Sequence, residues 1–181
     1  MSTAGVISVE DEREETSPIP EDLLVKVLKP YSDKGCRYLL DAQYKATDDS
    51  VLAFGNFCIP DSSYITSTGH FNAADLLICF NQLAYSAFAP AIVNEEIPVL
   101  VGWSIEDYFD YQLPSMLIKN TASRFRRPIN AHKFSARLMC QNFEIIERTW
   151  RYLKVPCTIE CWDDDGGAAS GQVELAALNI P

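Results

Sequence analysis

Apolar residues occupy nearly every azimuth between residues 73 and 89, within the stretch TSTGHFNAADLLICFNQLAYSAFAP at residues 66–90. A helix that is apolar all round is buried, so this pattern predicts one long central helix. The residues that interrupt the pattern are Gly69, His70 and Asn72 at the start, and Asp75, Asn81, Gln82, Tyr85 and Ser86 further along. Because an unsatisfied buried amide costs about 1–3 kcal/mol, we expect Gln82 and Ser86 to satisfy one another or to face a dimer interface.

The segments around this helix have the pattern of strands and short helices. Aromatic and branched residues predict two strands within residues 37–59, with a turn at Asp48–Ser50. Short helices are predicted at residues 21–29 and at 104–113, where Ser104 is a suitable N-cap and Asp107 follows three residues later. Further strands are predicted at residues 97–103, 115–127, 133–147, 148–164 and 169–178, with a hairpin turn at residues 165–167.

Consecutive hairpin-joined strands favour an antiparallel sheet, so the chain is predicted to be α+β, with the sheet packed on the central helix. An antiparallel sheet wrapped around one apolar helix is called the hot-dog fold. The length of 181 residues fits one domain. Residues 1–17 are acidic and are predicted to be a disordered tail, which leaves residues 18–181 as a single domain.

Charge and cysteine content narrow the classes of function. The N-terminus lacks the apolar region of a signal peptide, and no uninterrupted apolar run predicts a membrane span. The six cysteines form no C-x-x-C pair, so we expect no metal site and a cytoplasmic protein with reduced thiols. The net charge of −10 argues against general nucleic-acid binding.

One segment is basic, because no residue from 111 to 143 is acidic. Its cations are Lys119, Arg124, Arg126, Arg127, Lys133 and Arg137. Such a concentration in an acidic protein indicates a local anionic partner; the alternative is a solvated strand and loop.

The start of the central helix is a candidate site. Asn72 can cap the helix, and first-turn N–H groups without internal partners attract an oxygen that carries negative charge. A thioester carbonyl that becomes an enolate or oxyanion fits such a position. His70 lies beside it and can act as base or donor near neutral pH. His70 and Asn81 are eleven residues apart, roughly 16 Å along a helix, so a shared site would be composite across a dimer, or His70 is structural.

Two resemblances sharpen this interpretation. The segment GHFN before an apolar helix resembles the GHFP segment of hot-dog dehydratases that act on acyl-carrier-protein (ACP) substrates, although Asn81 replaces their carboxylate. A resemblance over nearly the whole chain identifies it as a member of the FcoT family. The segments that carry it are LKPYSDKGCRYLLDAQY, SSYITSTGHFNAADLLICFNQLAYSAFAPAIVNEEI, ASRFRRP, KFSARL, RTWRYLKVPC and GGAASGQVELAALNIP.

Family membership implies a function. FcoT proteins have been described as long-chain acyl-CoA thioesterases and as trans-2-enoyl-ACP glycyltransferases of isonitrile lipopeptide biosynthesis. The resemblance implies that glycine adds to the β-carbon of an enoyl thioester and that hydrolysis releases a 3-[(carboxymethyl)amino] fatty acid. Plain thioester hydrolysis, and acyl binding without catalysis, remain alternatives. We expect no cofactor and no acyl-enzyme, since no activated Ser or Cys nucleophile is evident.

The resemblance marks Tyr31, Tyr64 and Asn81 as functional, and we expect all three to be catalytic. From its place at the start of the helix, His70 is a fourth expected catalytic residue, and Ser63, Asn72 and Tyr85 are expected to bind substrate. The expected docking residues for the carrier protein or CoA are Arg124, Arg126, Arg127 and Lys133, in a homodimer or higher homo-oligomer. Alternation along a strand predicts that Arg124 and Arg126 share one face and that Arg127 lies outside it.

Overall fold

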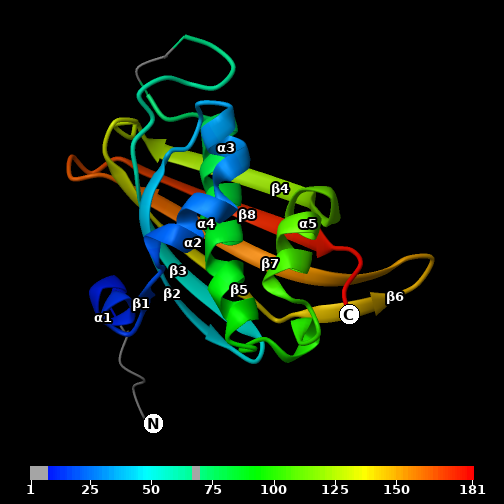
Figure 1. Ribbon diagram of the computed structural model, residues 1–181. Helices are drawn as coiled ribbons and strands as arrows, with labels where there is room; N and C mark the ends of the chain where they lie inside the picture. Colours follow the sequence, from blue (N-terminus) through cyan, green and yellow to red (C-terminus); the bar gives the residue numbers. More distant parts are fainter. Residues whose placement is uncertain (1–7, 67–69) are drawn as a thin grey trace.

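A computed structural model describes residues 8–66 and 70–181, and in it an antiparallel sheet wraps around one long helix (Figure 1). The strand order is β1-β2-β3-β5-β7-β8-β4, and β6 pairs with β7 beside this path. The strands are β1 (Ser17–Pro18), β2 (Leu39–Thr47), β3 (Ser50–Phe57), β4 (Met116–Arg127), β5 (Phe134–Gln141), β6 (Glu144–Glu147), β7 (Arg151–Trp162) and β8 (Ala168–Ala177). The protein has the predicted α+β hot-dog architecture.

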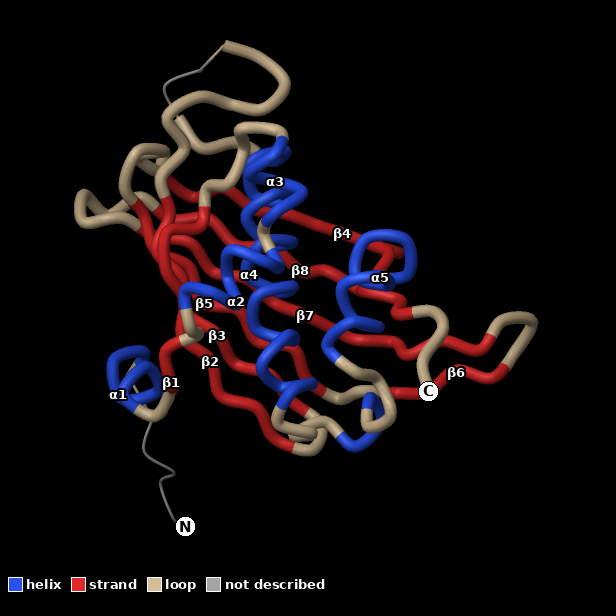
Figure 2. The backbone as a smooth tube through the Cα atoms, in the orientation of Figure 1, coloured by secondary structure: helices blue, strands red, loops and turns tan. Residues whose placement is uncertain are grey.

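The central helix α4 (Ala73–Val93) crosses the concave face of the sheet (Figure 2). Two strand glycines lie against α4. A Cβ added at Gly55 would lie 3.0 Å from the Leu83 side chain, and one added at Gly171 would lie 3.1 Å from that of Leu76. A larger residue at either position would require neighbouring core side chains to move, because core atoms are already close-packed.

Shorter helices cover the side of α4 that faces away from the sheet (Figure 2). They are α2 (Glu21–Val27), α3 (Lys29–Asp33) and α5 (Ile105–Ser115). By length and hydropathy α4 could cross a membrane, but 78% of its most apolar window is buried inside the protein. Such burial is typical of the core helix of a globular domain.

Most predicted elements are confirmed. The β2–β3 hairpin, the turn at residues 165–167 and the capped start of α5 are present as predicted. The predicted strand at residues 97–103 is wrong: Pro98–Leu100 form a 3-10 turn, since the chain reverses between α4 and α5 and a proline cannot donate to a strand ladder. The predicted strand at residues 133–147 is divided into β5 and β6 at Asn142, whose φ is +60°.

The prediction of a disordered tail is wrong for the part that the structure describes. Residues Val9–Glu14 form helix α1, which a reciprocal capping box between Ser8 and Asp11 closes at its start. Glu12 then accepts two hydrogen bonds from the Arg137 guanidinium, at 2.7 and 2.9 Å. This bidentate pair is largely shielded from water and attaches α1 to β5, an arrangement that acidic composition alone did not predict. Residues 1–7 lie outside the described part of the chain.

Candidate functional site

The start of α4 carries a connected set of polar side chains. Asn72 is the N-cap, and its Oδ1 accepts from the backbone N–H groups of Ala74 and Asp75 at 2.9 and 3.2 Å. The same oxygen accepts from the Tyr64 hydroxyl at 3.0 Å. The Nδ2 of Asn72 donates to Asp75, whose other oxygen accepts from Ser62 at 2.9 Å. The exposed loop that carries Tyr64 is therefore attached to the helix through side chains.

This network changes what the helix start can offer to a substrate. The N–H groups of Ala74 and Asp75 are occupied by Asn72, and that of Leu76 donates to the Asn72 carbonyl. The prediction that first-turn N–H groups lack partners is therefore wrong for these residues. A substrate oxygen would need donors other than these three N–H groups.

A second polar group lies in the middle of α4, beneath α3. The Asn81 side chain hydrogen-bonds to the Tyr31 hydroxyl, which comes from α3. Burial raises the pKa of Tyr31, the neighbouring Tyr85 adds to the rise, and the hydrogen bond from Asn81 opposes it. Burial also raises the pKa of Tyr85 to about 12. Three predicted site residues, Tyr31, Asn81 and Tyr85, thus lie together. The raised pKa keeps both tyrosine hydroxyls protonated near neutral pH.

Tyr38 connects the two polar groups. Its hydroxyl donates to the Asp61 carbonyl at 3.0 Å, and the side chain is 1% exposed. Burial raises the pKa of Tyr38, while a hydrogen bond with Ser63 lowers it. Cys36 and Cys79 lie close enough to raise the pKa of both Tyr38 and Tyr31. Polar side chains therefore follow one side of α4 from its start to its middle.

Sequence reasoning missed three members of this set: Tyr38, Cys36 and the carboxylate of Asp75. The sequence could have indicated these residues only by their positions. Tyr38 and Cys36 precede a strand, and Asp75 lies three residues after the cap. The partners of each come from segments that are distant in sequence or from a loop, and no local pattern identifies them.

Gln82 is a structural residue that holds the segment before β2 against α4. Its Oε1 accepts from the N–H groups of Tyr38 and Leu39 at 2.8 and 3.0 Å, and its Nε2 donates to the Cys36 carbonyl at 2.8 Å. The prediction that Gln82 and Ser86 satisfy one another is wrong, because Gln82 has these backbone partners. The Ser86 Oγ is buried without a hydrogen-bond partner among the described residues.

The structure does not bring His70 to Asn81. His70 is exposed and lines a depression of about 400 Å³ at the start of α4, together with Phe71, Asn72, Ala73, Phe125, Arg126, Arg127 and Pro128. Asn81 lies nine residues along the helix from Asn72, roughly 13 Å away. Gly69, predicted to permit a close approach here, lies outside the described residues.

The basic segment is partly neutralised, contrary to the expectation drawn from its local sequence. Acids from other segments pair with three of its cations: Lys119 with Glu174, Lys133 with Asp164 and Arg137 with Glu12. Within the described ranges Arg124, Arg126 and Arg127 form no ion pair, and all three are exposed. Arg124 and Arg126 line one depression, and Arg126 lines a second one together with Arg127. The pairing of β4 with β8 shifts register between Phe125 and Arg127, so the predicted alternation of these side chains stays a prediction.

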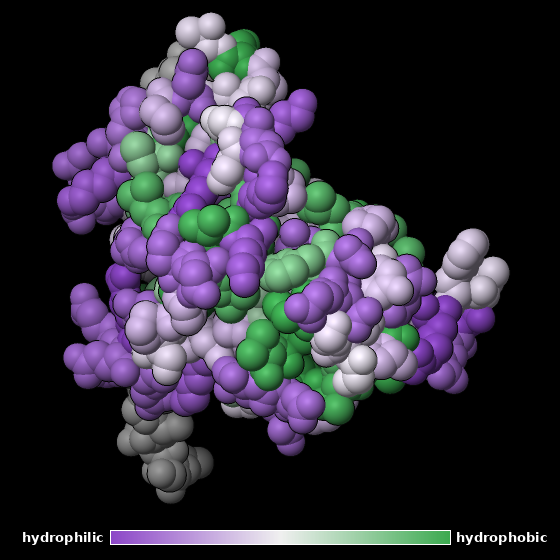
Figure 3. Space-filling view, viewed as in Figure 1, coloured by the Kyte–Doolittle hydropathy of each residue, from purple (hydrophilic) through white to green (hydrophobic). Residues whose placement is uncertain are grey.

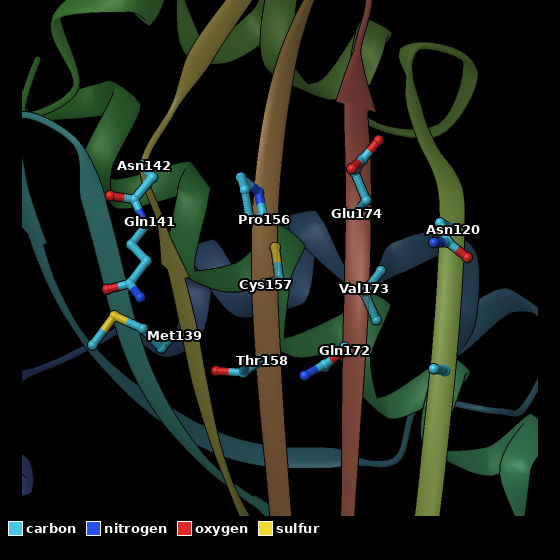
Figure 4. A pocket seen from close by; sticks show the side chains of 11 residues that line it. Asn120, Met139, Gln141, Asn142, Pro156, Cys157, Thr158, Gln172, Val173 and Glu174 are labelled. Atoms are coloured by element: carbon cyan, nitrogen blue, oxygen red, sulfur yellow. The ribbon is translucent and has the colours of Figure 1, made fainter.

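A different depression, of about 320 Å³, lies on the face of the sheet away from α4 (Figure 4). Met139, Thr158 and Gln172 point into it, in alternation with side chains that face the core. None of the predicted site residues lines it. Among the residues that the structure describes, no group of His, Cys, Asp or Glu is arranged to hold a metal ion.

Known proteins resemble this chain over almost its whole length. A relative named (2E)-enoyl-[ACP] glycyltransferase from Mycobacterium marinum is 72% identical over 166 residues, which cover 92% of this chain and 90% of that protein. A relative of the same name from Mycobacterium tuberculosis is 70% identical over 92% of this chain and 91% of its own length. One from Streptomyces coeruleorubidus is 35% identical over 89% of this chain and 98% of its own.

Comparison of folds finds thioesterases. The structure of a putative thioesterase from Shewanella oneidensis matches 88% of this chain and 99% of that chain, with 8% identity and a TM-score of 0.48. The model of the FcoT-like thioesterase domain family matches residues 26–177. That match, with relatives 70–72% identical, identifies the chain as a member of the FcoT-like thioesterase domain family.

Proposed function

We propose that this protein is a (2E)-enoyl-[ACP] glycyltransferase of isonitrile lipopeptide biosynthesis. The observation that carries the proposal is the 70–72% identity to relatives of that name over 92% of this chain. That the chain has a thioesterase-like hot-dog domain follows from the family match and from the fold itself.

The reaction has two stages. The neutral glycine amine attacks the β-carbon, and the electron pair of the double bond moves to the thioester oxygen as an enolate. The nitrogen, now an ammonium, loses a proton and Cα gains one, so no net proton is taken up or released. Water next attacks the thioester carbonyl, which releases the carrier thiol and a 3-[(carboxymethyl)amino] fatty acid. Both stages place negative charge on the same oxygen, so one hydrogen-bond donor aimed at it would serve both.

Tyr31 is the best-placed donor of this kind. Its side chain is hydrogen-bonded to Asn81, which would hold the phenol in one position. Because burial raises its pKa, Tyr31 stays protonated at neutral pH and suits a donor better than a base. Asn81 then orients Tyr31, and Tyr85 lies close to Tyr31. Tyr31 and Asn81 are two of the positions that the family resemblance marks.

A dimer would complete the site. β4 lies at one edge of the sheet, and from Lys119 to Arg127 each of its residues is exposed. Unpaired edges of this length are available for pairing with another chain. The view in Figure 3 also shows apolar surface around α5 and the segment before it, where Val101 and Leu113 are each 47% exposed. A second copy would bring its own helix start, with Tyr64 and His70, towards the Tyr31 group.

The carrier protein would dock on the unpaired arginines. Arg124, Arg126 and Arg127 lie along the end of β4 that runs towards the start of α4. An acidic carrier surface or a phosphate group would find its cations there, whereas Lys133 already has Asp164 as a partner.

The test is a product assay with purified protein and trans-2-enoyl-ACP substrates of several chain lengths, with and without glycine. Mass spectrometry should detect the glycine adduct as a free acid only when glycine is present. Release of unmodified enoyl acid at the same rate without glycine would instead support the second candidate, thioester hydrolysis, which the family description favours. Binding without any product would support an acyl-binding protein.

A further inference from the structure

Three helices of this protein begin with a capping residue that is followed three residues later by an aspartate. In α1 and α5, the caps Ser8 and Ser104 form reciprocal capping boxes with Asp11 and Asp107, whose carboxylates accept from the cap's backbone N–H. These two boxes stabilise their own helix starts.

The third helix, α4, uses the same spacing differently. Asp75 is 2% exposed, and its carboxylate accepts from the Asn72 side chain and from Ser62 rather than from the Asn72 backbone. This carboxylate is buried and does not cap the helix backbone. Because removing a charged group from water is costly, its presence at this position needs another explanation.

The orientation of the Asn72 amide follows from its surroundings. The backbone N–H groups of Ala74 and Asp75 can only donate, so the Asn72 atom that faces them is its oxygen. The Nδ2 group then points at the Asp75 carboxylate, which can only accept. Reversing the amide would place donors against donors and oxygen against carboxylate. The two backbone N–H groups set this orientation, and the Asp75 carboxylate holds the amide in it from the other side, through Nδ2.

The fixed amide in turn orients Tyr64. Its hydroxyl lies 3.0 Å from an Asn72 atom that can only accept, so the hydroxyl proton points at Asn72. The lone pairs of the Tyr64 oxygen then face outward, on a side chain that is 58% exposed. With its proton directed at Asn72, the Tyr64 hydroxyl oxygen can accept a hydrogen bond. The N–H groups of an amine could donate that hydrogen bond.

We propose that Asp75 is a positioning residue which, through Asn72, holds the Tyr64 hydroxyl as an acceptor for the glycine amine. This inference rests on the proposed glycyltransferase activity and adds a division of labour to it. Tyr31 faces the developing negative charge as a donor, whereas Tyr64 receives the nucleophile. Asp75 itself touches neither substrate.

The first test compares Asp75→Ala with Asp75→Asn in the full-length protein. Asp75→Ala should lower kcat/KM for glycine about tenfold while hydrolysis of a saturated acyl-ACP without glycine changes less than about twofold. Asp75→Asn should stay within about threefold of the wild type on both substrates, because its Oδ1 still accepts from Asn72. Equal losses in both assays would overturn the proposal, since a general structural defect affects the two alike.

A double-mutant cycle tests whether Asp75 acts through Tyr64. In a Tyr64→Phe background, adding Asp75→Ala should cost less than about a further twofold, because the hydroxyl to be oriented is already absent. A further tenfold loss would show that Asp75 acts by another route. Asp11→Ala is the matched control: it removes the corresponding aspartate from the capping box of α1 and should leave both activities unchanged.

If Asp75→Ala does not fold, Asn72→Ser carries the test. Serine caps a helix as well as asparagine, so the melting temperature should hold. Its short hydroxyl cannot reach both the helix and Tyr64, so the tenfold glycine defect should appear. Normal glycine kinetics in a folded Asn72→Ser protein would refute the inference. Wild-type protein that forms no glycine adduct would refute the proposed function instead, and the two failures are thereby distinct.

Discussion

Replacing Gln82 by leucine should destabilise the protein far more than replacing the other buried glutamine of the helical layer, Gln112. Gln82 is 0% exposed and makes three hydrogen bonds of 2.8–3.0 Å to the backbone of residues 36, 38 and 39. Gln112 is 3% exposed but makes one bond of 3.3 Å to the Val27 carbonyl, and its Oε1 is unpaired.

The magnitude follows from the groups left behind. Gln82→Leu leaves two N–H groups and one carbonyl without their partner, at about 1–3 kcal/mol for each that stays dry. Because water can reach part of the segment once it loosens, we expect a total loss of about 3–5 kcal/mol. Gln112→Leu leaves one carbonyl unpaired and also removes an unsatisfied oxygen, so its net cost should be about 1 kcal/mol or less.

Urea unfolding at matched protein concentration measures both variants. Gln82→Leu should also lower glycine addition, because the segment that Gln82 holds, residues 36–39, includes Tyr38. The thermal midpoint should fall by about 6–20 °C, given about 2–4 °C per kcal/mol for a chain of this size. Equal losses in the free energy of unfolding would refute this prediction. The two glutamines are similarly buried, and the predicted difference comes only from the number of hydrogen bonds that each one makes.

Four other predictions concern the site and its surroundings. Asn81→Ala should keep the fold and remove most product, and a soluble variant with near-normal turnover in the product assay would contradict its assigned role. Tyr64→Phe should slow glycine addition at least about tenfold, about 1.4 kcal/mol, with little change in melting temperature; a loss of stability alone would make Tyr64 structural. Arg124→Glu with Arg126→Glu should raise the apparent KM for carrier-bound substrate more than for a short thioester mimic, and added salt should shrink the difference, since charges are screened over about 10 Å at 0.1 M. The free energy of unfolding should fall as pH rises above about 10, where unfolded tyrosine ionises while burial keeps the pKa of Tyr85 at about 12; Tyr85→Phe should flatten that fall in unfolding curves measured between pH 9 and about 11.

The fold was largely predictable because its determinants are periodic. Each determinant is a pattern within a short stretch of sequence. Examples are the apolar residues on all sides of α4, the alternation in β5 and β7, and the turn residues between β7 and β8. The failures have one physical cause, which is partners that are distant in sequence. α1 is held by Arg137, 125 residues beyond Glu12, and nothing in residues 1–17 encodes that contact.

The candidate site was predictable in its residue types but not in its connections. A polar side chain in an apolar helix singles out Asn81, and a cap signal singles out Asn72. Asp75 has the spacing of an ordinary capping aspartate, and only its burial and its bond to the Asn72 side chain separate it from Asp107. The ion pairs that neutralise Lys119 and Lys133 likewise depend on tertiary neighbours.

In the proposed reaction, the two polar groups on α4 would divide the chemical requirements. An enolate oxygen needs a donor that stays protonated, and burial of Tyr31 beneath α3 provides one through its raised pKa. An amine needs an acceptor at a position that glycine can reach from water, and Tyr64 is exposed with its proton directed at Asn72. One buried environment could not meet both needs, because burial would also exclude the polar nucleophile. A separation of roughly 13 Å along the helix keeps the two environments apart, and in the proposed dimer the donor and the acceptor would come from different copies of the chain.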